Sequence, residues 1–266
     1  MSGAAVRWTV VDWPATEVSA RLATHDAVIC AAPLHATDAE VARMLPVLCT
    51  RERDRFAGYT NDVVARRFAM GRALLREIVG CALGIAPDAV TLHEGVHGKP
   101  VLAGALMSRP LWFSVAHCED LLLVALSRTS DVGVDLERAR SIEQWERVAD
   151  RVLAPVERAQ LQLAVDRGEE SGRAFLRCWC RVEAELKAIG CGIVGLEDHR
   201  AGRRPLGLRV VDLDPLPLPA SIAAAGVRYQ AALALCAPGL ESARQSVLAS
   251  PQAARPTIPP ARASTA

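Results

Sequence analysis

The sequence predicts an α+β protein with an antiparallel sheet, and three features of the chain support this fold class. A hydrophobic share of 51% over 266 residues is enough to bury a substantial core. Apolar runs of strand length follow one another in the middle of the chain, and helical patterns gather before and after them. This order differs from the strict alternation of strand and helix that builds a parallel sheet.

The first part of the chain predicts two strands followed by two helices. Short apolar runs at residues 6–13 and 27–31 are typical of strands. Thr37 and Glu40 form a capping-box pattern, and the apolar residues behind them follow helical spacing. A second helix is expected to begin near Asn61, with Gly80 as its candidate C-cap.

The middle of the chain predicts three consecutive strands. Residues 111–116 and 121–127 are apolar runs separated by a short polar turn. Residues 132–137 alternate between apolar and polar side chains, as a strand with one buried face does. We expect these three strands to form an antiparallel meander.

The remaining elements are helices and then strands. A capping-box pattern at residues 141–144 and Pro155 predict the starts of two helices. A longer helix is expected over residues 173–189, ending at Gly190. Residues 206–213 and 227–236 predict two closing strands, separated by a proline-rich turn.

The order of these elements divides the chain into two mixed blocks and a tail. We expect an N-terminal α+β half over residues 1–127 and a C-terminal α+β half over residues 128–240. From residue 241 to residue 266 the chain is rich in Ala, Ser, Pro and Arg without periodicity, which predicts a disordered tail.

The overall charge and the cysteine usage narrow the functional classes. The chain has 31 Lys and Arg against 30 Asp and Glu, which argues against a dedicated nucleic-acid-binding protein. Neither a signal-peptide pattern nor an apolar stretch of membrane-spanning length is visible. Eight cysteines in a chain of this length indicate reduced thiols. We therefore expect a cytoplasmic protein that binds neither nucleic acid nor membrane.

Asp135 and Glu137 are a candidate metal-binding pair. Separated by two positions on a strand, their carboxylates project from the same face. Two adjacent negative charges are unfavourable unless a cation lies between them, and Mg²⁺ prefers such oxygen ligands. A solvated polar face of the strand is the alternative interpretation, and for an isolated pair it is the more common one.

The long helix carries a second candidate group. Trp179, Glu183 and Lys187 are four residues apart and therefore lie in one column on the helix. Glu183 could complete a carboxylate cluster, and Lys187 could bind a phosphate. An ordinary surface Glu–Lys pair is the alternative.

Two further positions could contact an anion. His117 falls at the end of a predicted strand, and Lys99 lies in a loop rich in glycine and proline at residues 95–100. A solvated histidine and a simple chain reversal are the alternatives. Lys99 and Lys187 are the only two lysines in the chain, whereas its other basic residues are arginines.

Five segments in this order and spacing resemble the surfactin-type 4′-phosphopantetheinyl transferases, and the resemblance covers about residues 45–195. The matching segments are Arg67-Phe-Ala-Met-Gly-Arg-Ala-Leu-Leu-Arg76, Gly98-Lys-Pro100, Phe113-Ser-Val-Ala-His117, Gly133-Val-Asp-Leu-Glu137 and Trp179-Cys-Arg-Val-Glu-Ala-Glu-Leu-Lys187. Each motif is weak by itself, and their shared register makes the resemblance specific.

This resemblance implies both a fold and a reaction. Members of the family are monomers built of two similar α/β halves related by a pseudo-twofold, with the site at their junction. They use Mg²⁺ to transfer the phosphopantetheine arm of coenzyme A to a serine of an apo acyl or peptidyl carrier protein. Fatty-acid, polyketide and nonribosomal-peptide carriers all remain open as partners.

The resemblance also implies roles for individual residues. Asp135, Glu137 and Glu183 match the metal ligands; Asp135, Glu183 and Lys187 are the expected catalytic residues, with Glu183, directly or through a water, as the base. The expected coenzyme A contacts are Arg67 at the 3′-phosphate, Lys187 and His117 at phosphate, and Lys99 and Pro100 beside the adenine. Arg51, Arg53 and Arg55 are expected to extend the basic rim that Arg67 begins.

Two positions depart from the family pattern. Val182 stands where a lysine is usual, and Ala116 stands where a serine is common. Arg181 lies about 100° away from Val182 on a helix and would have to reach round to compensate. The first departure leaves an alternative function open, a non-catalytic module that binds coenzyme A or a carrier protein.

Overall fold

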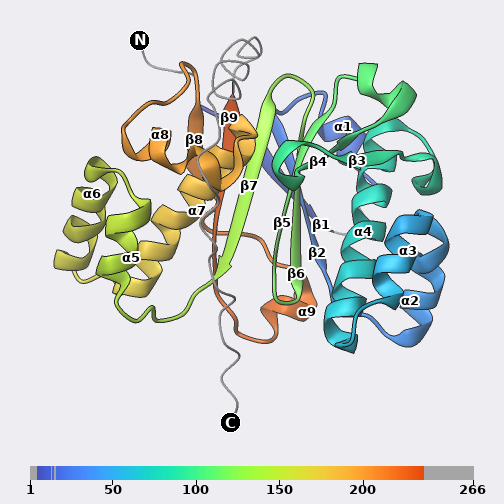
Figure 1. Cartoon of the computed structure of the whole chain (residues 1–266), viewed down its shortest axis with the longest axis horizontal. Helices are drawn as coiled ribbons and strands as arrows, with labels where there is room; N and C mark the ends of the chain where they lie inside the picture. Colours follow the sequence, from blue (N-terminus) through green and yellow to red (C-terminus); the bar gives the residue numbers. More distant parts are fainter. Residues whose placement is uncertain (1–4, 13, 15, 237–266) are drawn as a thin grey trace.

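The computed structural model describes residues 5–12, 14 and 16–236 and shows two main sheets flanked by helices (Figure 1). A four-stranded sheet has the order β1-β2-β6-β5, a three-stranded sheet has the order β7-β9-β8, and β3 and β4 form a hairpin. The strands are β1 (Trp8–Asp12), β2 (Ala27–Pro33), β3 (Leu92–Glu94), β4 (Pro100–Leu102), β5 (Trp112–Cys118), β6 (Leu121–Ser127), β7 (Asp131–Arg138), β8 (Arg209–Asp212) and β9 (Tyr229–Cys236).

The helices lie outside these sheets and none of the described ones has the length and apolarity needed to cross a membrane. They are α1 (Val18–Arg21), α2 (Asp38–Met44), α3 (Thr50–Ala57), α4 (Asp62–Leu83), α5 (Trp145–Val152), α6 (Pro155–Asp166), α7 (Ser171–Ile189), α8 (Leu196–Arg200) and α9 (Ala220–Ala223). The predicted tail over residues 241–266 lies outside the described residues.

The predicted α+β class is confirmed, whereas the predicted three-stranded meander is wrong. β5 and β6 form the expected antiparallel hairpin, and a parallel β1–β2 pair makes the larger sheet mixed. β7 leaves this sheet and pairs with β9 along its whole length. The apolar alternation of β7 identified it as a strand but carried no information about its partner.

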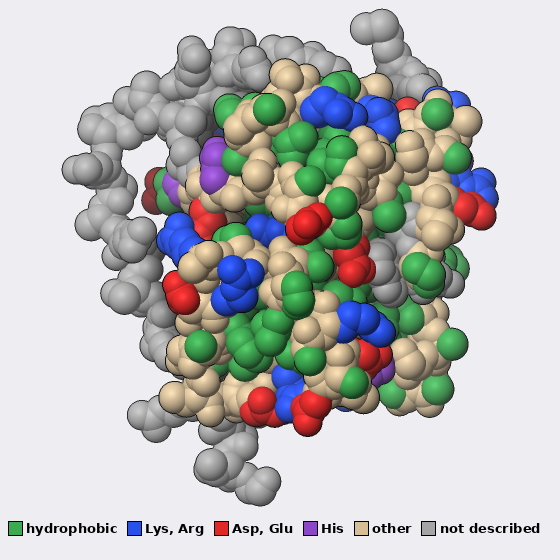
Figure 2. All heavy atoms as spheres, turned by 90° about the vertical axis from the view of Figure 1, so that its right-hand side faces the viewer, with side chains coloured by type: hydrophobic (Ala, Val, Ile, Leu, Met, Phe, Trp, Pro, Cys, Tyr) green, Lys and Arg blue, Asp and Glu red, His purple; other side chains and the backbone are tan. Residues whose placement is uncertain are grey.

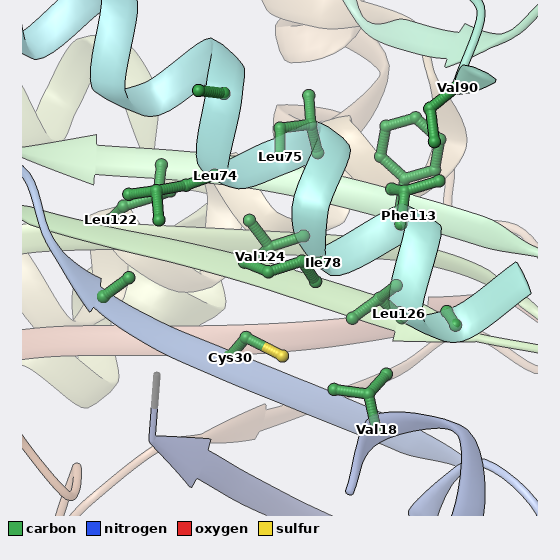
Figure 3. Packing of buried hydrophobic residues seen from close by; sticks show 14 of the residues in the cluster. Val18, Cys30, Leu74, Leu75, Ile78, Val90, Phe113, Leu122, Val124 and Leu126 are labelled. Carbon is green, nitrogen blue, oxygen red and sulfur yellow. The ribbon is translucent and has the colours of Figure 1, made fainter. Parts of the chain in front are cut away.

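Helix α4 covers one face of the four-stranded sheet (Figure 3). Leu74 and Ile78 of the helix pack with Leu122, Val124 and Leu126 of β6. The side chain of Asn61 caps the helix by accepting a hydrogen bond from the backbone N–H of Val64, at 3.1 Å. This contact confirms the predicted start of the helix.

The predicted end of α4 at Gly80 is wrong, because the helix continues to Leu83. Gly84 then adopts a left-handed conformation with φ 69°, which ends the helix. Gly80 serves a different purpose: a Cβ there would lie 2.8 Å from the carbonyl oxygen of Ile85. The absence of a side chain lets the chain fold back over the helix.

The second core lies between the two sheets. Leu121, Leu123 and Ala125 point away from α4 and pack with Val134 of β7 and Leu233 of β9. The strand β6 is therefore buried on both faces, which explains its uninterrupted apolar sequence.

Helix α7 covers the three-stranded sheet, and α5 and α6 pack on the other side of α7. The contact with the sheet consists of small side chains, among them Ala184 and Ala188 of α7 and Ala232 and Ala234 of β9. Small residues let the helix and the sheet approach closely. The predicted capping box before α5 is wrong, because Gln144 is the N-cap, with φ 53° and no side-chain hydrogen bond to the first turn of the helix backbone.

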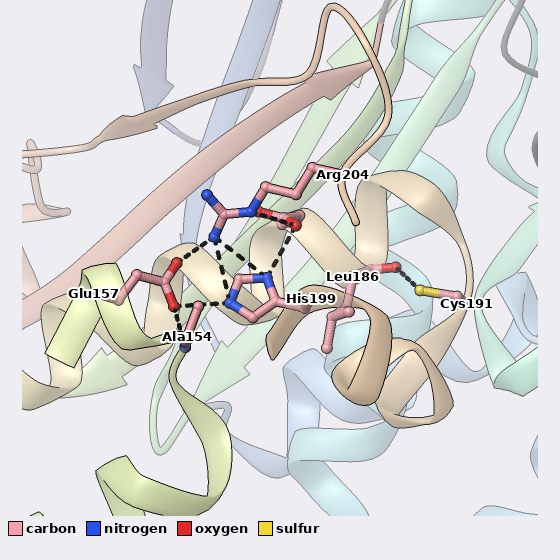
Figure 4. Close-up of polar contacts among 7 residues, drawn as sticks. Ala154, Glu157, Leu186, Cys191, His199 and Arg204 are labelled. Atoms are coloured by element: carbon pink, nitrogen blue, oxygen red, sulfur yellow. Dashed lines mark hydrogen bonds and ion pairs between the residues drawn. The ribbon is translucent and has the colours of Figure 1, made fainter. Parts of the chain in front are cut away.

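A buried polar network joins α6, α7 and α8 (Figure 4). The two ring nitrogens of His199 lie 2.8 Å from Glu157 Oε2 and 2.9 Å from Glu185 Oε1. Arg204 pairs with the same two carboxylates. His199 and Glu185 are each only 2% exposed, so these charges compensate one another away from water.

Candidate active site

The two sheets meet along β5 and β7, which lie side by side (Figure 1). The backbone N–H of Val134 donates to the hydroxyl of Ser114 at 3.2 Å, and that of Arg138 donates to the thiol of Cys118 at 3.3 Å. Both contacts join residues 20 positions apart, so the two strands run in the same direction. We call this junction the seam. Hydrogen bonds between side chains of β5 and the backbone of β7 close it.

Gly133 brings α7 unusually close to β7. A Cβ at this position would lie 1.9 Å from the carbonyl oxygen of Ala184 and 2.4 Å from the backbone nitrogen of Ala188. No side chain fits in that space, so glycine is required by the close approach of helix and strand. The approach brings the side of α7 that carries Glu183 and Lys187 close to Asp135 of β7.

Lys187 and Asp135 form the central contact of this region. The ammonium of Lys187 lies 2.7 Å from Asp135 Oδ1 and also donates to the carbonyl oxygen of Val134 at 3.1 Å. Asp135 is only 8% exposed, so the ion pair lies largely away from water and removal of one partner would leave a buried charge uncompensated. The structure thus brings together two residues that are 52 positions apart in the sequence.

Glu183 shares the electrostatic environment of both strand carboxylates. Burial is the largest cause that raises the pKa of Glu183, and the negative charges of Asp135 and Glu137 raise it further. Lys187 acts in the opposite direction. Glu137 also pairs with Arg140, at 3.0 Å.

The carboxylates of Asp135, Glu137 and Glu183 influence one another electrostatically, but they do not converge on one point as metal ligands do. Among the residues that the structure describes, no three Asp, Glu, His or Cys side chains lie close enough together to hold a metal ion. Their chemistry nevertheless fits a hard divalent cation, because all three offer carboxylate oxygens and their mutual repulsion raises the pKa of Glu183. The assignment of metal ligands remains a prediction.

His117 shares its electrostatic environment with Lys187 and Arg67. Partial burial lowers the pKa of the His117 ring, and the positive charges of Lys187 and Arg67 lower it further. Arg67 donates from Nε and Nη2 to Asp120 Oδ1, at 3.0 and 2.8 Å. A convergence of basic groups of this kind suits an anion such as phosphate.

Lys99 and Pro100 belong to the β3–β4 hairpin, which reaches the C-terminal end of α7. The ammonium of Lys99 donates to the carbonyl oxygen of Lys187 at 2.7 Å and to that of Val132 at 3.0 Å. Pro100 is the first residue of β4 and pairs with Glu94. Both of these hydrogen bonds are directed at the protein backbone.

The arginines of α3 face acidic and aromatic neighbours. Arg51 and Arg55 each lie 3.9 Å from a carboxylate oxygen of Glu94, and Arg55 also lies over the ring of Phe68. Arg53 donates to the carbonyl oxygen of Leu48. Figure 2 shows acidic and basic side chains interspersed on the face of the molecule that lies on the right of Figure 1.

Val182 and Arg181 point away from the candidate site. Val182 is 0% exposed and packs in the apolar cluster with Leu153 and Leu161. Arg181 donates from Nε and Nη2 to the carboxylate of Asp212, at 2.6 and 2.5 Å. The guanidinium is thus occupied on β8, and its position does not support the suggested compensation for a missing lysine.

Several residues that shape the site were not singled out from the sequence. Asp120 holds Arg67, Arg140 holds Glu137, and Ser114 closes the seam. Their contacts depend on tertiary structure and leave no local pattern. Gly133 did carry a signal, because a glycine inside an alternating strand often marks a close backbone approach.

Comparison with known proteins gives two family matches that adjoin near the seam. Residues 34–129 match the family described as 4′-phosphopantetheinyl transferase, N-terminal, and residues 131–216 match the 4′-phosphopantetheinyl transferase superfamily. The resemblance carried by the sequence motifs is thereby confirmed.

Individual relatives agree with the family matches. The 4′-phosphopantetheinyl transferase HetI of Nostoc sp. is 32% identical over 173 residues, which cover 65% of this chain and 72% of HetI. AcpT of Salmonella typhimurium is 36% identical over 121 residues, covering 45% of this chain and 56% of AcpT. The L-aminoadipate-semialdehyde dehydrogenase-phosphopantetheinyl transferase of Xenopus laevis is 28% identical over 159 residues, covering 55% and 52%. The chain thus spans little more than half the length of the last two.

Proposed function

Because the chain belongs to the 4′-phosphopantetheinyl transferase superfamily and is an enzyme of that kind, we propose that its site between β7 and α7 takes coenzyme A and Mg²⁺. The phosphopantetheine arm passes to a serine of an apo acyl or peptidyl carrier protein. The observation that carries this proposal is the pairing of buried Asp135 with Lys187 beside Glu183.

The transfer exchanges one phosphorus–oxygen bond for another. The serine oxygen bonds to the phosphorus that carries the pantetheine arm, and the bond from that phosphorus to 3′,5′-ADP breaks. Glu183 takes the proton of the serine hydroxyl, directly or through a water. Burial and the negative charges of Asp135 and Glu137 raise the pKa of Glu183, and a carboxylate within reach of the hydroxyl is a candidate general base.

Different charged groups around the seam bind different parts of coenzyme A. Asp135, Glu137 and Glu183 would hold Mg²⁺, which when bound neutralises charge on the pyrophosphate. Lys187 and His117 bind phosphate oxygens, and Arg67 binds the 3′-phosphate. The loop of Lys99 and Pro100 lies beside the adenine.

We also propose that the protein is a monomer, as its membership of this family implies. The molar mass from light scattering tests this statement. A mass of twice 28.5 kDa at working concentration would contradict it.

The proposed reaction is tested by incubating the protein with coenzyme A, Mg²⁺ and a panel of apo carrier proteins, and measuring the intact mass of each carrier. We expect one pantetheinyl adduct, which a chelator abolishes and added Mg²⁺ restores. Coenzyme A binding without Mg²⁺ dependence and without an adduct on any carrier would instead indicate the non-catalytic module.

Asp135→Asn tests the residue assignment. Loss of one carboxylate charge should lower kcat by about 100-fold or more, because it removes stabilisation that develops in the transition state. Asp131→Asn, four residues earlier on the same strand, is the matched control and should retain activity. Wild-type turnover in Asp135→Asn would remove this residue from the proposed site.

A further inference from the structure

The two lysines of the chain reach the same region of backbone from two different elements. Lys187 reaches from α7 to the carbonyl oxygen of Val134 on β7. Lys99 reaches from the β3–β4 hairpin to the carbonyl oxygens of Lys187 and of Val132. The side chain of Lys187 is therefore bonded directly to β7, and its backbone carbonyl is linked through Lys99 to a position two residues earlier on that strand.

Each carbonyl that Lys99 binds needs a partner from outside its own element. Lys187 lies in the last turn of α7, where carbonyl groups lack intrahelical donors and where a positive charge is favourable. Val132 is two positions before Val134, whose backbone N–H faces Ser114 across the seam. Alternation along a strand therefore directs the carbonyl of Val132 to the same edge.

A second, independent contact seats the hairpin on this end of α7. Gly192 follows the helix with φ 58°, and a Cβ placed there would lie 2.9 Å from Cβ of His97. His97 is two residues before Lys99, in the turn that joins β3 to β4. The hairpin therefore rests directly against the segment that follows α7.

We propose that Lys99 is a positioning residue, which acts by fixing the last turn of α7 against β7 and so holding Lys187 at Asp135. This inference rests on the proposed function, since it assigns Lys187 to phosphate. A small displacement of a group in an active site is enough to lower the rate strongly. On this view Lys99 supports the reaction through Lys187, and its own ammonium does not contact coenzyme A.

The first test observes Lys187 without using activity. Because the chain has two lysines, a protein labelled with ¹⁵Nζ-lysine should give two side-chain amine signals in the folded state. Lys99→Met leaves one signal, and we expect the Lys187 signal to shift and to exchange faster with water. Lys99→Arg retains the positive charge and can donate to both carbonyl groups, so it should restore the wild-type Lys187 signal.

The second test measures kinetics with coenzyme A and an apo carrier. Lys99→Met should lower kcat by about 10- to 100-fold while KM for coenzyme A changes little. Its effect should largely disappear in a Lys187→Met background, because residues that act through one another are not additive. Lys99→Arg should recover most of kcat.

Arg109→Met is the matched control for stability. Arg109 donates to the carbonyl oxygen of Leu83 at the end of α4, at 3.1 Å, and so makes the same kind of contact away from the site. It should lower the melting temperature without changing kcat or either lysine signal. Gly192→Ala is the second variant, because it keeps both lysines and displaces His97; it should shift the Lys187 signal and lower kcat.

Three results would overturn the proposal. One is a raised KM for coenzyme A in Lys99→Met with unchanged kcat, which indicates direct contact with the ligand. Another is a loss of stability like that of Arg109→Met with no change in kcat. The third is an unchanged Lys187 signal in both Lys99→Met and Gly192→Ala. Because the amine signals do not require turnover, they test this inference even if the wild-type protein modifies no carrier.

Discussion

Val182 occupies a position on α7 whose surroundings exclude a charged side chain. It is fully buried, and its neighbours one turn away, Cys178 and Leu186, lie in the same apolar cluster. Replacing it by the lysine that is usual in the family would bury an ammonium without a partner. The departure from the family pattern is therefore matched by the packing of α5 and α6 on this face.

Val182→Lys should lower the free energy of unfolding by about 3 kcal/mol or more, because it buries an uncompensated charge. Urea unfolding measures this change, and Val182→Ile, which stays apolar, should cost less than about 1.5 kcal/mol. Wild-type stability together with faster transfer in Val182→Lys would show that position 182 faces the site.

Gly133 is a second residue whose identity follows from one close contact. Gly133→Ala should destabilise the protein by about 2 kcal/mol or more, because the new methyl group collides with backbone of α7 and forces the helix away. Chemical denaturation of the two proteins gives the difference.

Gly71→Ala on α4 is the matched control for Gly133→Ala. Its Cβ would meet only Leu34, at 3.7 Å, an ordinary contact. Alanine is also the better helix former, so this variant should be neutral or gain up to about 1 kcal/mol. Equal stability changes in the two glycine variants would contradict the close packing of α7 on β7.

Among the elements, the His199 network determines how three helices respond to pH. Burial by itself lowers the pKa of His199, but hydrogen bonds with Glu157 and Glu185 outweigh it and raise the pKa to about 9. Both ring nitrogens then donate, and the imidazolium and Arg204 together balance the two carboxylates.

The stability that this network contributes should depend on pH between 6.5 and 9. Because the folded pKa lies above the ordinary value of 6.5, the contribution is complete below pH 6.5 and is lost as pH rises through about 9. We expect a loss of the order of 2 to 3 kcal/mol relative to His199→Gln.

The measurement is thermal or urea unfolding of wild type and His199→Gln across this pH range. His35→Gln, at an exposed position, is the control and should follow the wild-type profile. Parallel profiles for wild type and His199→Gln would show that His199 is not held as an imidazolium.

Elements were predictable where their signal is local. The span of β6, the start of α4 at Asn61 and the end of α7 at Gly190 all agree with the sequence patterns. The partner of β7 was not predictable, because β9 lies about 90 residues later in the chain. The alternation of apolar and polar residues identifies a strand but not the strand with which it pairs. The sequence pattern predicts only a loop over residues 95–100, because the strands β3 and β4 that flank it have just three residues each.

At the scale of the whole molecule, the sequence motifs converge on the seam. Lys187 pairs with Asp135, and the charges of both act on Glu183. The charges of Lys187 and Arg67 also act on His117. The sequence did not predict that Lys99 binds backbone 33 and 88 residues away. Such contacts form only when the two sheets have assembled, so no local sequence pattern predicts them.

The seam also has a consequence for fragments of the chain. Because side chains close it in place of a backbone ladder, β5 and β7 each keep one strand edge whose hydrogen-bonding groups are covered only while the two parts are together. A fragment cut between these strands would display an open edge, which is a template for pairing with further copies. Separately produced fragments should therefore aggregate, whereas fragments produced together can cover one another.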